Sequence, residues 1–311
     1  MLPLERVIRR NGFFVRRRDL IAMGYTDAHL RHSLRLRRIF RVRHGWYSIP
    51  AAPEAGIRAV RVGGRLTALS ALESYGLPVP RSSALQVAVR PTSSRLRSPD
   101  DRRVRLTRFA GVTVFWTDRG GLSPWRLSVA DALVAVLATE GRDVAVAACS
   151  AALHAGALKD WELDLVFDRA PARVRRWRTL VSAQDESHGE TYVRLWFGDA
   201  GIACEQQVLV PGVGRLDFRL RHGLFAEIDG GQHADEAQRR KDHDRDLAVA
   251  ALGGRTIRIL YHQLLGDWPA VLAAVVRAIA DADALAARRR RHPYRPRPTR
   301  KRRRSGAKPA P

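Results

Sequence analysis

The chain has 311 residues, 45% of them hydrophobic, and this length predicts about two domains with cores of their own. Two cysteines cannot build a zinc cluster or a disulfide framework, and no uncharged stretch reaches the ~20 residues of a membrane span, so we expect a cytoplasmic protein without a membrane partner. Lys and Arg outnumber Asp and Glu by 55 to 31, a net charge of +24 that predicts a polyanionic partner, nucleic acid above all.

Residues 1–60 are predicted to form a small helical domain closed by a β-hairpin. Short helices are expected over 4–10, 17–23 and 27–36. Thr26 can cap the third helix, and a hairpin with its turn at Gly45 follows. Three helices and a hairpin are the layout of a winged helix-turn-helix domain, whose third helix enters the major groove of DNA.

The third helix carries a basic row that we predict to contact DNA. The row comprises Arg31 and Arg35, four residues apart, with Arg37 and Arg38 at the helix exit. A generic helical bundle with a solvated arginine face is the alternative. Because the hairpin is basic as well, DNA binding is the better interpretation.

Residues 61–180 are predicted to form an α+β connector domain. Its helices and strands alternate without an evident motif, and no residue in it assembles into a site. Residues 181–284 show a sharper pattern, in which helices and strands follow in the order α-β-β-β-α-β-α. That order predicts a mixed sheet flanked by helices. Residues 285–311 combine proline with like charge, twelve Lys or Arg and no acid from 288 onward, and are predicted to be disordered.

Two carboxylates face each other across a predicted hairpin. RLDFRL and LFAEID both alternate, and a three-residue loop, 221–223, would pair residue 220 with 224 and Asp217 with Glu227. Side chains opposed in this way have Cβ atoms roughly 5 Å apart. Like charges so close repel each other, so a fold that keeps them usually binds a cation or shares a proton. Asp217 and Glu227 are therefore predicted metal ligands.

The same region resembles a known family. GETYVRLWF, RLDF, FAEIDGGQH and DRDLAVAALGGRTIRI are similar to proteins related to the very-short-patch mismatch repair endonuclease, within the PD-(D/E)XK nuclease superfamily. The resemblance implies a restriction-endonuclease-like α/β/α fold and a phosphodiesterase that depends on Mg²⁺ or Mn²⁺. It also implies roles for four residues: Asp217 as metal ligand, Glu227 as the next acid, Glu190 as the acid of the first helix, and His233 as the repair-type histidine.

One departure from the family pattern bears on activity. The lysine expected two residues past the second acid is Asp229, so its function would pass to His233, Lys241 or Arg245 or be absent. Each residue also has a structural alternative. Asp229 falls opposite Arg215 and can form an ion pair with it. Glu190 follows Ser187 in a capping-box pattern, His233 can serve only to start a helix, and Arg245 belongs to a charged helix face from which it could contact phosphate.

Residues 8–50 resemble a second family more loosely. GFFVRRRDLIAMGYTDAHLRHSL and RRIFRVRHGWYSI are similar to the N-terminal winged-helix domain of AbiEi-type antitoxins of type IV toxin–antitoxin systems. The resemblance implies DNA binding, with the operator of a toxin operon as one target. It implies nothing about cleavage.

These observations predict an α+β multidomain protein with a winged helix, a connector, a nuclease-like domain and a basic tail. The first functional hypothesis is a DNA-binding, metal-dependent endonuclease in defence or repair. The alternative is an antitoxin-like transcriptional regulator whose nuclease fold is inactive. An architectural nucleic-acid-binding protein that uses the arginine-rich tail is a third hypothesis.

Overall fold

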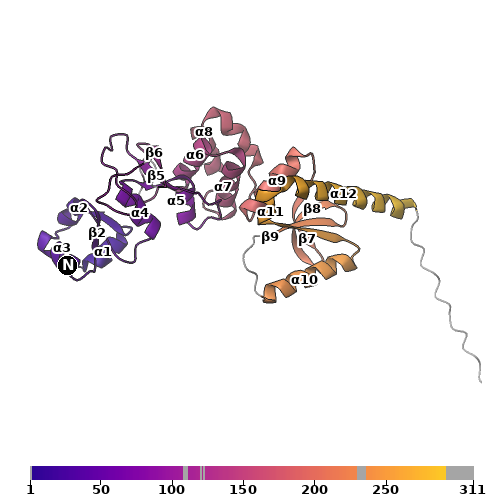
Figure 1. The fold of residues 1–311 in the computed structure, drawn as a ribbon, viewed down its shortest axis with the longest axis horizontal. Coiled ribbons are helices and arrows are strands. Elements are labelled where there is room, and N and C mark those ends of the chain that lie inside the picture. Colours follow the sequence, from indigo (N-terminus) through magenta and orange to yellow (C-terminus); the bar gives the residue numbers. More distant parts are fainter. Residues whose placement is uncertain (1, 108–110, 120, 122, 230–235, 292–311) are drawn as a thin grey trace, which may run out of the picture. The chain divides into compact units, whose positions relative to one another are not determined.

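The computed structural model describes residues 2–107, 111–119, 121, 123–229 and 236–291 (Figure 1). The chain divides into two compact units, Met1–Ile202 and Ala203–Pro311. Both contain helices and small sheets, as an α+β protein should. Among the described residues, no helix has the length and apolar character needed to cross a membrane.

The first unit begins with helices and strands in the order α-β-α-α-β-β. Their bounds are α1 (Leu4–Arg10), β1 (Phe14–Arg16), α2 (Arg17–Ala22), α3 (Asp27–Arg35), β2 (Phe40–Arg43) and β3 (Trp46–Ser48). The strands form an antiparallel sheet in the order β1-β3-β2, and β1 was not predicted. Thr26 caps α3 as expected, because its hydroxyl accepts the amide hydrogen of His29. Gly45, with φ at +73°, forms the turn between β2 and β3.

The rest of the first unit surrounds a second small sheet with helices. Its elements are α4 (Glu54–Val62), β4 (Arg65–Leu66), α5 (Ala68–Ser74), β5 (Leu85–Val89), β6 (Val112–Trp116), α6 (Val129–Thr139), α7 (Arg142–His154), α8 (Asp160–Arg169), the 3₁₀ helix η1 (Ala172–Leu180) and α9 (His188–Asp199). β5 lies between β4, which is antiparallel to it, and β6, which is parallel. The apolar faces of α5, α6 and α7 supply much of the core.

The core of the first unit crosses the predicted domain boundary at residue 60. That boundary falls inside α4, and Phe14 of β1 packs in the same core as the helices that follow. The ring centroids of Phe14 and Trp125 are 6.2 Å apart. A Cβ added to Gly56 would lie within 2.9 Å of the nearest atom of each ring. Helix α4 therefore packs so closely against this aromatic pair that only glycine fits at position 56.

Helix α9 belongs to the first unit, which corrects the predicted start of the C-terminal domain at residue 181. The guanidinium of Arg142, on α7, donates to both carboxylate oxygens of Asp199 at 2.9 and 2.6 Å. The indole of Trp196 donates to Asp143 at 2.8 Å. The sequence of α9 alone does not predict these long-range contacts with α7. Because of such contacts α9 packs with the first unit, and the boundary between the units lies between Ile202 and Ala203.

The second unit contains one mixed four-stranded sheet among the described residues. Its elements are β7 (Glu205–Val210), β8 (Gly214–Arg221), β9 (Leu224–Asp229), α10 (Glu236–Ala251), β10 (Arg255–Leu260), α11 (Tyr261–Gly266) and α12 (Trp268–Arg291). The strand order is β10-β9-β8-β7, antiparallel except for the β9–β10 pair. Figure 1 shows α10 and α12 on opposite sides of this sheet. The predicted mixed sheet flanked by helices is confirmed.

The β8–β9 hairpin keeps the predicted register away from its tip. Phe218 lies opposite Ala226, as predicted, but Arg221 lies opposite Leu224 after an irregularity in the ladder. The loop is therefore His222-Gly223, and the predicted three-residue loop is wrong. The irregularity between Arg219 and Arg221 places one extra residue in β8 without a partner in β9. The alternation of apolar and polar residues does not predict such a bulge. Gly223 takes a φ of +73° in this turn.

The last helix runs further than predicted. Helix α12 continues to Arg291, so residues 285–291 are helical and the predicted start of the disordered tail at 285 is wrong. Leu, Ala and Arg in this segment are strong helix formers, and arginines near a helix C-terminus interact favourably with its dipole. Residues 292–311, the rest of the predicted tail, lie outside the described residues.

Candidate active site

The predicted carboxylate pair lies on two adjacent strands of the second unit. Asp217 on β8 is half-buried, and Glu227 on β9 is only 5% exposed. The ladder positions Phe218–Ala226 and Arg219–Phe225, continued by one residue, set Asp217 opposite Glu227. An Asp217 oxygen also accepts the amide hydrogen of Ile228 at 2.8 Å. Asp217 is therefore hydrogen-bonded to β9, the strand that carries Glu227.

Glu227 is held by two arginines. One of its carboxylate oxygens lies 2.6 Å from a guanidinium nitrogen of Arg245, on α10, and the other lies 3.0 Å from Arg258, on β10. Arg258 is the direct partner of Glu227 in the parallel β9–β10 ladder. The side chains of both arginines are about a third exposed or less. Glu227 is thus a buried carboxylate with a cation on each oxygen.

Further contacts join these groups into a network. Arg258 also donates to both carboxylate oxygens of Asp246, on α10, at 3.1 Å each. Arg245 also donates to the backbone carbonyl of Arg215, on β8. The carboxylates of Asp217, Glu227 and Asp246 and the two guanidiniums together leave one negative charge when all are ionised. Among these five described side chains, the acids therefore outnumber the guanidiniums by one.

The pKa of Glu227 shows which force dominates. Burial raises the pKa of this carboxyl, and the nearby Asp217 and Asp246 raise it further, while Arg245 and Arg258 lower it. The pKa is above its ordinary value, so burial and the two nearby acids together outweigh the attraction of both arginines. A carboxylate in that state is stabilised by any additional cation.

Sequence reasoning did not identify Arg258 and Asp246 as site residues. A signal for Arg258 existed: in RTIRIL it is a cation inside a strand, and Thr256 and Arg258 alternate with Ile257 and Ile259. This pattern identifies Arg258 as a site residue only once the β9–β10 register is known, because that register pairs Arg258 with Glu227. Asp246 was taken for part of a solvated helix face, whereas it bridges to β10.

Glu190, the predicted acid of the first helix, belongs to the first unit and not to the unit of Asp217 and Glu227. It is 6% exposed on the first turn of α9, and its amide donates to the Ser187 hydroxyl at 3.2 Å. Its carboxylate accepts the amide hydrogen of Glu186 at 3.0 Å, one residue before the position of an ordinary capping box. These contacts match the predicted capping role.

The remaining predicted residues are placed as follows. Asp229 is exposed at the end of β9, and its ion pair with Arg215 stays a prediction. His233 lies outside the described residues. The four arginines predicted to contact DNA are all exposed on or just after α3: Arg31, Arg35, Arg37 and Arg38.

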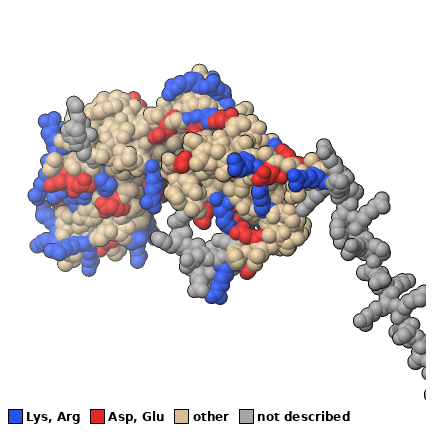
Figure 2. All heavy atoms as spheres, turned by 45° about the vertical axis from the view of Figure 1, so that its right-hand side comes forward, with Lys and Arg blue, Asp and Glu red and all other residues tan. Residues whose placement is uncertain are grey.

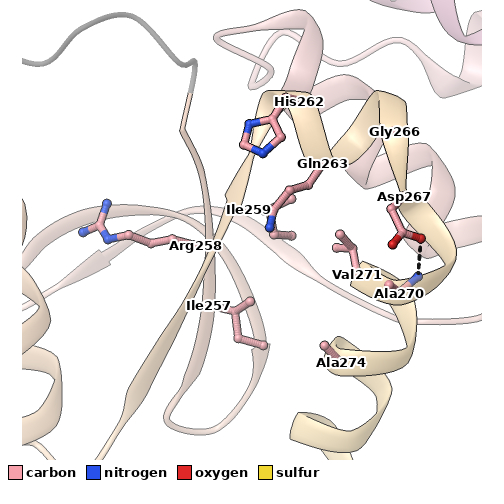
Figure 3. Close-up of a pocket in the computed structure, with 10 residues that line it drawn as sticks. All are labelled: Ile257, Arg258, Ile259, His262, Gln263, Gly266, Asp267, Ala270, Val271 and Ala274. Carbon is pink, nitrogen blue, oxygen red and sulfur yellow. Dashed lines mark hydrogen bonds between the residues drawn. The ribbon is translucent and has the colours of Figure 1, made fainter.

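A cavity of about 450 Å³ lies next to β10, and Arg258 of the network is among its lining residues. Ile257, Val271 and Ala274 line it between β10 and α12. Figure 3 shows the side chain of Arg258 directed away from these residues. The lining residues of the cavity do not include Asp217, Glu227 or Asp246.

The donor set agrees in kind with a Mg²⁺ site. Mg²⁺ prefers carboxylate oxygens, uses one or two of them, and keeps several waters or substrate oxygens. Asp217 and Glu227 supply that many carboxylates. Among the described residues, no group of three or more His, Cys, Asp or Glu side chains is arranged to hold a metal. An ion held by these two carboxylates would have to displace the guanidiniums of Arg245 and Arg258 from the carboxylate oxygens of Glu227.

Comparison with known proteins gives little further information. No family model matches the chain, and no curated protein matches it. Among solved structures, the catalytic domain of the homing endonuclease I-Bth0305I is similar to 29% of this chain and 90% of its own length, with 21% identity and a TM-score of 0.26. A likeness at this TM-score does not establish a common fold, and no family is assigned from it.

Proposed function

We propose that the chain is a DNA-binding protein whose second unit cleaves DNA with Mg²⁺ or Mn²⁺ at Asp217 and Glu227. The observation that carries the proposal is the buried carboxylate Glu227 opposite Asp217. Its burial, together with the charges of Asp217 and Asp246, outweighs the attraction of its two arginines. Buried carboxylates in proteins usually have partners that offset their burial, and the two arginines of Glu227 do so only in part. A divalent cation would be such a partner.

Each residue of the network would have a distinct role. Asp217 and Glu227 would hold the metal, which when bound polarises a phosphoryl oxygen and lowers the pKa of a water. Arg258 and Arg245, released from Glu227, could bind the oxygens of the scissile phosphate, because guanidinium matches phosphate in bidentate geometry. Arg258 would then supply the positive charge that Asp229 cannot. Asp246 would keep Arg258 oriented through its paired hydrogen bonds.

DNA binding by the first unit is proposed on its element order and charge. Three short helices followed by the β2–β3 hairpin support a winged helix-turn-helix, in which α3 would be the recognition helix. Exposed arginines on and after α3 would contact phosphates or base edges. Operator DNA and the substrate of the nuclease are both compatible with such a domain.

The second candidate is a regulator, such as an antitoxin-like repressor, in which the nuclease fold is a scaffold. It is favoured by the arginines that occupy both oxygens of Glu227 and by Asp229 in the position of the family lysine. In this case the network would be purely structural. A buried ion network of this kind specifies how α10 and β10 pack without requiring any ligand.

The deciding experiment is cleavage of plasmid and linear duplex DNA by the full chain in Mg²⁺ and in Mn²⁺. Asp217→Asn keeps an acceptor for the Ile228 amide but removes the charge. We expect it to lose at least about 100-fold in cleavage rate, since even an outer-shell partner of a metal is worth about 10–100-fold. Asp244→Asn, an exposed acid of α10, is the matched control and should cleave like the wild type.

DNA affinity measured on the same samples separates the candidates. The endonuclease predicts that Asp217→Asn still binds DNA. If the wild type cleaves no form of DNA in either metal, yet binds duplex and loses that binding in Arg31→Gln/Arg35→Gln, the regulator replaces the endonuclease. Equal cleavage by wild type and Asp217→Asn would point to a contaminating nuclease and contradict the proposed site.

A further inference from the structure

A second group of arginines lies in the first unit, and none of its members belongs to the arginine row on and after α3. Arg16 ends β1, Arg65 begins β4, and Arg90 directly follows β5. In the β4–β5 ladder Arg65 is opposite Ala88, so Arg90 is its diagonal neighbour on the same face. Such diagonal neighbours lie about 7–8 Å apart, within reach of arginine side chains. The β4–β5 ladder therefore places Arg65 and Arg90 side by side. Arg16 is near enough for its charge to act on Arg65 and for that of Arg90 to act on it, and we call Arg16, Arg65 and Arg90 the arginine cluster.

The arginine cluster is not neutralised within the described residues. None of its three members forms an ion pair with a carboxylate there, whereas arginines elsewhere in the same unit, such as Arg142 and Arg194, do. Arg16 instead has its guanidinium 5.0 Å from the ring centroid of Trp46. A cation–π contact orients a guanidinium without cancelling its charge.

Electrostatics show that the three side chains affect one another. Burial lowers the pKa of Arg65, and the charges of Arg16 and Arg90 lower it further. Burial also lowers the pKa of Arg16, with contributions from Arg18 and Arg90 and a partial offset from Asp19. Arg16 and Arg65 are half-buried, and Arg90 is exposed. The cluster combines desolvation with like-charge repulsion, and both reduce the stability of the free protein.

An anion with several oxygens would relieve both costs. Guanidinium donors match phosphate oxygens, and arginines held on strands lose less conformational entropy on binding than arginines on a flexible loop. In Figure 2, Lys and Arg predominate over Asp and Glu across the N-terminal part of the first unit, so a polyanion would be attracted to it.

We propose that Arg16, Arg65 and Arg90 form a phosphate-binding site for the backbone of duplex DNA. This site acts in addition to the arginine row of α3 and holds the DNA against the strands β1, β4 and β5. The choice of DNA rests on the proposed function, while the anion site itself does not. Free inorganic phosphates share the same chemistry, and the test below separates the two sources.

The test compares the full chain with the double variant Arg65→Gln/Arg90→Gln. Duplex DNA affinity is measured over a range of salt concentrations. We expect the slope of log K against log salt to fall by about 1 to 2, since each phosphate contact contributes about 0.9. Arg81→Gln/Arg102→Gln removes the same charge from exposed loop positions of the same unit and is the matched control. Its slope should change by clearly less.

Thermal stability of the same proteins shows whether the arginines are structural. The proposed site predicts that the double variant is at least as stable as the wild type. If it is less stable, Arg90→Gln alone, at an exposed position, must still reduce the slope for the proposal to stand. A slope that is unchanged in both variants, while wild type binds DNA, overturns the proposal and leaves the proposed function intact.

Inorganic tripolyphosphate provides a test that is independent of DNA. It should raise the melting temperature of wild type and of the control double variant, and raise that of Arg65→Gln/Arg90→Gln clearly less. If wild type binds no DNA but this difference is seen, the anion site stands without the proposed function. If tripolyphosphate affects all three proteins equally, or affects none of them, the anion site is overturned.

Discussion

Two groups of arginines, one in each unit, differ in how they are partnered. In the second unit, Arg245 and Arg258 each contact a carboxylate oxygen of the buried Glu227. In the first unit, Arg16, Arg65 and Arg90 gather without an ion pair to a carboxylate among the described residues. A paired guanidinium holds its carboxylate in place, whereas an unpaired and partly desolvated one retains a repulsion that an anion can relieve. The same residue type can therefore be evidence for a cation site in one unit and for an anion site in the other.

The largest effect on stability is expected from Arg258→Met. This change leaves Glu227 with one cation and removes the partner of Asp246. The free energy of unfolding should therefore fall by about 3 kcal/mol, the low end of the range for buried ion pairs that lose one partner, because the Arg258 side chain is 27% exposed. Urea unfolding at neutral pH measures it. Arg219→Met, in the same sheet, removes an exposed pair with Glu205 and should cost less than about 1 kcal/mol. Equal losses in the two variants would show that the Glu227 network is not effectively buried.

A smaller effect is expected in the pH dependence of Glu227→Gln. Because the pKa of Glu227 is raised in the folded protein, the folded state binds its proton more tightly than the unfolded state. Stability from this group is therefore full below the ordinary Glu pKa and is lost as pH rises through the raised value. The free energy of unfolding of wild type, relative to Glu227→Gln, should decline over that range. Glu205→Gln, an exposed position, is the control, and parallel pH curves for wild type and Glu227→Gln would contradict the raised pKa.

The smallest effect, and one of opposite sign, is expected from Arg65→Gln. Removing one of the mutually repelling cations should raise the free energy of unfolding by up to about 1 kcal/mol, the scale of like-charge pairs on neighbouring strands. Thermal or urea unfolding at low ionic strength measures the gain, which should shrink as salt screens the repulsion. A loss of stability would show that Arg65 is a structural residue, and the contrast between the two units would then disappear.

Local patterns in the sequence were sufficient for much of the second unit. Alternation in RLDFRL and LFAEID predicted two strands, and the charges at Asp217 and Glu227 predicted opposed carboxylates. The register at Phe218 and Ala226 is as predicted. The pairing at the tip of the hairpin was not predictable, because a bulge inserts one unpaired residue into a strand and the sequence pattern carries no mark of it.

The contacts of Glu227 depended on the tertiary structure. Arg258 is distant from Glu227 in the chain, and a parallel strand pair brings the two together through a crossover that contains α10. Parallel strands always need a crossover connection of this kind. The pattern of apolar and polar residues in the two strands does not reveal which residue of one lies opposite which residue of the other. The arginine cluster of the first unit arises similarly from three separate strands. That no carboxylate of the described part of the chain pairs with this cluster could not be inferred from composition.

The sequence by itself determined the classes of element, the charge and the carboxylate pair, because hydrophobic alternation and charge are local properties of the chain. Only the tertiary structure decided which unit holds α9 and which arginines meet Glu227. Those outcomes depend on contacts between residues far apart in sequence, such as Arg142 with Asp199 and Arg258 with Glu227. Such contacts form only when whole elements pack, since the burial that makes them strong is created by the fold.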